Sequence, residues 1–239
     1  MKKIKMKNPG YLSPIFLSLG LVGMFLYKWL FSYVEDPVSG LLPAFTLPEI
    51  LLWVLTAGVC VSAFVFTRGT VFGSLGTSVS TVSDVLFAMG FVVQLLTDVT
   101  GPAALVLIYR ITCALAAVAL AVMAFFRSKG KKPPFVTELA PCIACVVHLL
   151  ICYQLWSEVP QLMNYVMGLG AVLCLSMGAY FRLAAAAELP GKPWNNAVGL
   201  MGVYFCTVAA FSGTFNLFFT TAAMWLGSTY AGITEAEAK

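Results

Sequence analysis

The chain has 239 residues, of which 60% are hydrophobic and only 10% are charged, and its mean hydropathy is +0.92. These values lie far outside the range of soluble globular domains and indicate an integral membrane protein. The net charge of +4 is small, and most basic residues lie between apolar runs. We therefore expect the lipid bilayer as the main partner, and no nucleic acid.

The first apolar run covers about 11–34 and follows a start that contains Lys2, Lys3, Lys5 and Lys7. A signal peptide shares the basic start, but its apolar core is only about 7–15 residues and it ends at a small-residue cleavage site. This run is longer, and no Ala-x-Ala pattern follows it. The pattern predicts an uncleaved first span with a cytoplasmic N-terminus.

Later apolar runs show a repeated ending, in which an aromatic residue is followed closely by Arg68, Arg127 or Arg182. Basic residues at span ends favour the cytoplasmic side, and the returning segments carry acid but no Lys or Arg. A span needs roughly 20 apolar residues, so the chain can hold seven or eight. We predict an all-α polytopic membrane helix bundle that forms one domain over 1–239, with spans at about 11–34, 47–66, 79–97, 103–126, 135–156, 161–181, 195–211 and 215–230.

The last apolar region, about 195–230, is ambiguous. At 1.5 Å per residue it would be roughly 54 Å long, too long for one crossing. It either folds at Ser212-Gly213-Thr214 into two short spans or forms one span and a helix on the outer surface. Residues 216–225 are apolar almost all round, whereas a surface helix needs a polar face. This favours two spans, and eight spans would place the C-terminal tail inside.

Arg110 is the strongest candidate for a functional residue, because a charge inside a bilayer is costly. It lies about 12 Å below the outer end of the fourth span. At 100° per residue, Asp84, Gln94 and Asp98 share one face of the third span. We expect an Asp98–Arg110 pair braced by Gln94. The pair either holds spans three and four together or binds an anionic or polar solute.

The fifth span carries a second group of candidates, in which Cys142, Cys145, His148 and Cys152 share a face with Glu138. A Cys-x-x-Cys pair near a histidine is typical of a thiol–disulfide centre or a soft-metal site. However, ligands spread over about 15 Å of one helix cannot converge on a metal. The cysteines are therefore interpreted as packing residues, with no metal or cofactor expected. We expect Glu138 to reach the interface.

His148 is the only histidine of the chain, which excludes a bis-histidine haem within one subunit. Near the middle of the membrane it either belongs to a proton relay or forms a hydrogen bond to a neighbouring helix. The sequence alone leaves both roles open, and we include His148 among the candidate binding residues.

Three functional hypotheses remain. The first is a small-solute permease or the membrane subunit of a transporter, with Gly168-Leu169-Gly170 as a candidate helix break. The second is a structural or assembly subunit, which would bind other membrane proteins or a second copy of itself. The third is a membrane thiol-redox enzyme that uses Cys142 and Cys145. The composition suits a bacterial cytoplasmic membrane.

Overall fold

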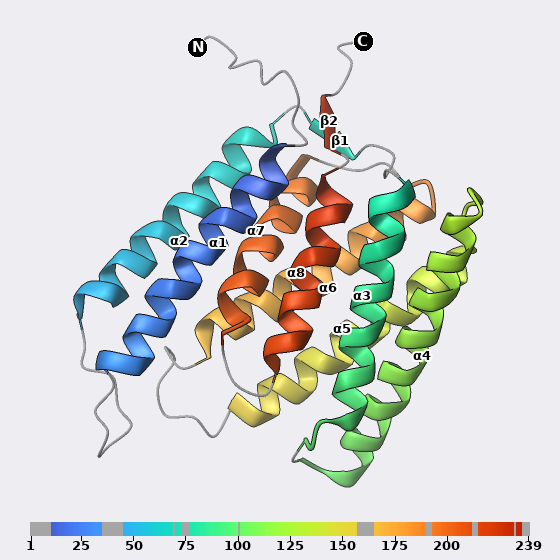
Figure 1. Ribbon diagram of the computed structural model, residues 1–239, viewed down its shortest axis with the longest axis horizontal. Coiled ribbons are helices and arrows are strands. Elements are labelled where there is room, and N and C mark those ends of the chain that lie inside the picture. Colours follow the sequence, from blue (N-terminus) through green and yellow to red (C-terminus); the bar gives the residue numbers. More distant parts are fainter. Residues whose placement is uncertain are drawn as a thin grey trace.

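A computed structural model of the chain describes residues 11–34, 45–68, 70–72, 77–99, 101–156, 165–189, 193–211, 215–231 and 233–235. This part of the chain forms eight α-helices and one antiparallel pair of short strands (Figure 1). The elements are α1 (Leu12–Trp29, followed by a π-helical turn at Leu30–Val34), α2 (Leu47–Phe66), β1 (Thr70–Phe72), α3 (Thr77–Leu96), α4 (Ala103–Ser128), α5 (Phe135–Trp156), α6 (Val166–Ala186), α7 (Pro193–Ala209), α8 (Asn216–Tyr230) and β2 (Ile233–Glu235).

Six of the described helices, α1 to α6, are long and apolar enough to cross a membrane. Their outer faces are apolar as well: Val54 on α2 and Val118 on α4 are 65% and 64% exposed. Exposed apolar faces on helices of this length are typical of contact with lipid hydrocarbon. The prediction of an all-α, multi-pass helical membrane bundle is therefore confirmed at this level.

The two shorter helices, α7 and α8, lie in the middle of the bundle. α7 packs against α1, α2, α6 and α8, while α8 packs against α3 and α7 (Figure 1). The side chains of Tyr204 on α7 and Trp225 on α8 are fully buried. The alternative of a surface helix for the last apolar region is therefore wrong. The expected fold at Ser212-Gly213-Thr214 lies outside the described residues.

Small residues let α8 approach its neighbours closely. The Tyr230 ring of α8 lies where a side chain on Gly199 of α7 would stand, and Thr221 of α8 similarly covers Gly90 of α3. Close backbone approach through small residues is the usual way in which helices gain packing energy inside a bilayer. This packing places α8 against the polar residues of α3.

Two contacts show which helix ends lie together. β1 pairs with β2 antiparallel, and Ser13 Oγ at the start of α1 donates a hydrogen bond of 2.6 Å to the Gly227 carbonyl near the end of α8. We call the end of the bundle at which β1 and β2 pair the strand end. The helices alternate in direction, so α2, α4, α6 and α8 finish at the strand end (Figure 1).

Helices α1 to α5, with the π-helical turn included, begin and end within two residues of the predicted spans. α6 differs, because it starts at Val166 and continues to Ala186, beyond the predicted end at 181. Its last turn contains Leu183 and three alanines, which are strong helix formers. Arg182 consequently lies within α6 and not at its end.

Candidate functional site

Four charged side chains meet inside the bundle near the strand end: Asp84 of α3, Arg127 of α4, Glu138 of α5 and Arg182 of α6. Arg182 donates through Nη2 to Asp84 Oδ1 and through Nε to Glu138 Oε2, each at 2.9 Å. Arg127 approaches the same two carboxylates, with Nη2 2.9 Å from Glu138 Oε1 and Nη1 2.8 Å from Asp84 Oδ2. The Arg127–Asp84 contact is an ion pair without hydrogen-bond alignment. Each arginine thus contacts both acids, and we call these four residues the ion network.

α8 completes the surroundings of the ion network. Arg182 Nη1 donates to Thr229 Oγ1 at 3.0 Å, and its guanidinium lies 4.6 Å from the centre of the Trp225 ring. The Trp225 indole N–H donates to Asp84 Oδ1 at 2.9 Å. Two positive and two negative charges cancel, so the group enters the low-dielectric interior as a neutral unit. The four members of the ion network come from four helices, α3 to α6, and the contacts of Trp225 and Thr229 add α8. The ion network thus links five helices at one level.

The burial of these side chains corrects the sequence interpretation of three residues. Arg127 and Arg182 were expected at a membrane surface and Glu138 at the interface, but their side chains are only 10%, 2% and 4% exposed. These side chains can be buried because each carboxylate is paired with a guanidinium and each guanidinium with a carboxylate, which offsets the cost of removing the charges from water. The signal was present in the sequence, since Asp84 and Glu138 lie near the same ends of their spans as the two arginines.

A second polar group lies deeper, and it joins two residues that the sequence had singled out, Gln94 and His148. The Tyr109 hydroxyl of α4 lies 3.0 Å from Gln94 Oε1 of α3 and 2.8 Å from His148 Nδ1 of α5. His148 Nε2 is 3.4 Å from Cys152 Sγ. Gln94, Tyr109, His148 and Cys152 are all buried. We call these four residues the polar chain.

The hydrogens of the polar chain can be assigned from its donors and acceptors. If Tyr109 donates to Gln94 Oε1, its single hydrogen is used, so His148 must donate from Nδ1 to the Tyr109 oxygen. His148 Nε2 then accepts from the Cys152 thiol. In this arrangement every group is neutral, and the Gln94 amide N–H₂ has no hydrogen-bond partner among the described residues. If the amide is turned over, its oxygen is left without a partner instead.

Aromatic rings separate the ion network from the polar chain. Asp84 and Gln94 are about 15 Å apart along α3 at 1.5 Å per residue. Between these levels the Phe87 ring stacks on Trp225 at 4.7 Å, and Phe91 contacts Phe218 at 5.3 Å. The next contact is Phe218 on the His148 ring, at 4.3 Å. The interior therefore has three levels: charged, aromatic and neutral polar.

Arg110, the leading candidate from the sequence, belongs to neither group. Its Nη2 lies 3.9 Å from Asp98 Oδ1, and its side chain is 49% exposed. Asp98 follows the end of α3, so the helical periodicity that aligned it with Asp84 no longer applies. Gln94 does not brace this pair, because its oxygen accepts from Tyr109.

The exposure of Arg110 has a geometric explanation. α4 has 26 residues, or about 39 Å, while the hydrocarbon layer is about 30 Å thick. Arg110 therefore lies close enough to the membrane surface at the end of the bundle opposite the strand end for its long side chain to reach the head groups.

The cysteines of α5 lie in the packed interior. Cys142 and Cys145 are buried and have free thiols. Within the described residues, no group of three or more His, Cys, Asp or Glu side chains is arranged to hold a metal ion. Cys145 lies beside α6, where Ser176 donates to its carbonyl oxygen at 3.2 Å. These contacts are those of packing residues.

Comparison of the chain with protein-family models, with curated proteins and with solved structures finds no match.

Proposed function

We propose that this multi-pass membrane protein is a small-solute permease, or the solute-binding membrane subunit of a transporter. One observation carries the proposal: the polar chain ends in a buried Gln94 amide, one group of which has no partner in the part of the chain that the structure describes. An unpaired buried amide costs about 1–3 kcal/mol, and ligand sites are typically apolar with a few well-placed polar groups. A small polar solute that pairs with Gln94 would remove this cost.

The proposed solute site comprises Gln94, Tyr109 and His148, beside the ring of Phe218. In this proposal the aromatic level blocks the path to the strand end, and the ion network closes that end. Asp84 then acts as a gate residue, since opening α3 from α6 and α8 would break its bonds to Arg182 and Trp225. Arg110 and Asp98 would instead hold the outer ends of α3 and α4 together.

The proposal includes eight crossings, with the strand end and the N-terminus in the cytoplasm. α7 and α8 have 17 and 15 residues, or about 26 and 23 Å. Short helices inside a bundle can cross because their ends contact protein and not lipid. The loop with Lys129, Lys131 and Lys132 lies at the strand end, as expected for the cytoplasmic side of a bacterial membrane protein.

The first experiment is a search for a small molecule that the protein binds and transports. The purified full chain is screened for a shift of its unfolding temperature with a panel of amino acids, sugars, nucleosides and short carboxylates. Each stabilising compound is then tested for uptake into vesicles that contain the protein. We expect at least one compound to give both signals and Gln94→Leu to abolish both. Arg110→Leu, a variant outside the proposed site, is the control and retains them.

A second candidate function is a structural or assembly subunit, and one observation favours it. The ion network is neutral and its four charges are paired, so it needs no ligand, as expected if its role is to join helices. If no compound of the panel binds, and a second protein copurifies in constant ratio, the permease proposal is wrong and the assembly role replaces it. A membrane thiol enzyme has less support, because the side chains of Cys142 and Cys145 are buried.

A further inference from the structure

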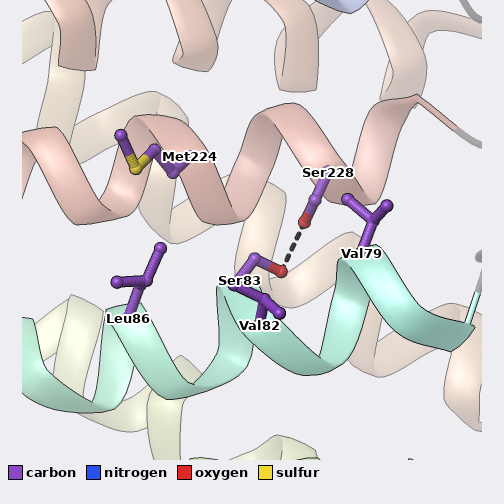
Figure 2. A pocket seen from close by; sticks show the side chains of 6 residues that line it. All are labelled: Val79, Val82, Ser83, Leu86, Met224 and Ser228. Atoms are coloured by element: carbon purple, nitrogen blue, oxygen red, sulfur yellow. Dashed lines mark hydrogen bonds between the residues drawn. The ribbon is translucent and has the colours of Figure 1, made fainter.

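A groove runs between α3 and α8 on the outside of the bundle, near the strand end. Its volume is about 390 Å³, within the range of ligand-sized pockets. Figure 2 shows the lining: Val79, Val82, Ser83 and Leu86 from α3, and Met224 and Ser228 from α8.

The polar atoms of the groove are already paired. Ser228 Oγ donates across the two helices to Ser83 Oγ at 2.6 Å (Figure 2), and Ser83 Oγ donates to the Ser80 carbonyl at 2.9 Å. None of the six lining residues is charged. The groove therefore presents a hydrocarbon surface. A polar or ionic ligand would lose its hydration there without gaining a hydrogen-bond partner.

The groove is continuous with the surface that faces the bilayer. Val79 and Val82 are 65% and 61% exposed, and exposed apolar side chains continue along the same helix at Val85 and Met89. The segment Val79–Leu96 is one of the candidate membrane spans. The medium outside the groove is thus lipid hydrocarbon, and a hollow of this size in that surface must be filled by it.

We propose that this groove binds one acyl chain of a membrane phospholipid as a specific site. The chain lies against Val82, Leu86 and Met224 and covers the Ser83–Ser228 hydrogen bond. The residues next to these serines and to Met224 are Asp84 and Trp225, whose contact joins α3 to α8 in the ion network. The bound chain therefore braces the helix pair that holds the ion network closed. This inference does not depend on the identity of any transported solute.

The test uses the full chain in vesicles of phosphatidylethanolamine and phosphatidylglycerol. A trace of phosphatidylethanolamine carries a photoactivatable diazirine in one acyl chain, and adducts are mapped by mass spectrometry after irradiation. We expect several-fold more adducts at Val82, Leu86 and Met224 than at Leu115 and Val118 on α4, although these two controls are 58% and 64% exposed and Leu86 is only partly exposed. Equal labelling at all of these positions would overturn the proposal.

Two matched pairs of variants locate the site. Met224→Trp fills the groove from α8, and Leu217→Trp places the same side chain on the same helix at equal exposure, 46% against 47%. On α3, Val82→Phe fills the groove, and Val92→Phe is its control because Val92 does not line the groove. Filling variants should lower adduct yield at Leu86 several-fold, while the control variants leave it unchanged.

Native mass spectrometry of the unmodified chain tests lipid binding without relying on the folding of any variant. We expect one phospholipid to remain bound after mild detergent extraction. A protein released without lipid would contradict the proposal. So would photo-adducts that join the groove residues to a second copy of the chain, because the occupant would then be a protein helix.

Discussion

Asp84 on α3 and Arg182 on α6 are 98 residues apart in the chain, and they form a buried hydrogen-bonded ion pair of 2.9 Å. Glu138 on α5 accepts a second hydrogen bond from the same guanidinium, also at 2.9 Å. A guanidinium held by two carboxylates needs both of them in register, so three helices are fixed in depth relative to one another.

Removing Arg182 should destabilise the protein strongly. Arg182→Met leaves Asp84 and Glu138 with Arg127 alone, and breaking a buried pair in this way costs about 3–5 kcal/mol. Arg110→Leu is the control, because its exposed pair with Asp98 is worth only about 0–1 kcal/mol. Unfolding in detergent, followed by circular dichroism, measures both variants. Equal stabilities would show that the ion network does not form as described.

A second substitution should partly restore the Arg182 variant. Arg182→Met leaves the network with one excess negative charge, and adding Glu138→Gln returns it to neutrality. We expect the double variant to be more stable than Arg182→Met by about 0.5–3 kcal/mol, which is the usual range for coupled neighbours. The four proteins of this double-mutant cycle are compared by the same unfolding measurement. If the two losses simply add, the side chains do not interact.

The polar chain predicts an effect for one hydroxyl group. Tyr109→Phe leaves Gln94 Oε1 and His148 Nδ1 without their shared partner, at a cost of about 1–3 kcal/mol. Tyr153→Phe removes the same atom from a side chain that is 68% exposed on α5, and it should change little. Unfolding temperatures of the two variants, measured in parallel, make the comparison. A neutral Tyr109→Phe would mean that the polar chain is not formed.

Two glycines provide a matched test of the packing of α7 and α8. A side chain on Gly199 would overlap the Tyr230 ring, whereas one on Gly58 of α2 meets nothing within 4 Å. Gly199→Ala should therefore destabilise by about 1–3 kcal/mol through overpacking. Gly58→Ala should be neutral or stabilise by up to about 1 kcal/mol, because alanine favours a helix. The reverse order would contradict the central position of α8.

The pairing of β1 with β2 predicts the sidedness of the chain. An epitope inserted at Gly130, in the loop between α4 and α5, and one attached after Lys239 should react with antibody from the same side of the membrane. An epitope between α5 and α6 should react only from the other side. Sealed vesicles of known orientation give the measurement. Reaction of the first two epitopes from opposite sides would exclude eight crossings.

The sequence by itself determined the class of protein and the approximate positions of its helices. This follows because a bilayer requires about 20 consecutive apolar residues for each helical span, and such runs can be read directly from the chain. It also identified Asp84, Gln94 and His148 as polar residues within spans. Sequence periodicity shows which residues share a face of one helix, but it does not show which helix that face meets.

The partners of these residues were decided only by the tertiary structure. The sequence places Asp84 and Arg182 near the same end of the bundle, but only the packing of α3, α6 and α8 shows that they pair, with Trp225 and Thr229 beside them. Tyr109 was overlooked for a related reason: a tyrosine in an apolar run is usually a packing residue, and only α3 and α5 together give its hydroxyl two partners. The position of Arg110 along α4 could be read from the sequence, but the sequence did not show that this face of the helix lies on the outside of the bundle, where the side chain is 49% exposed.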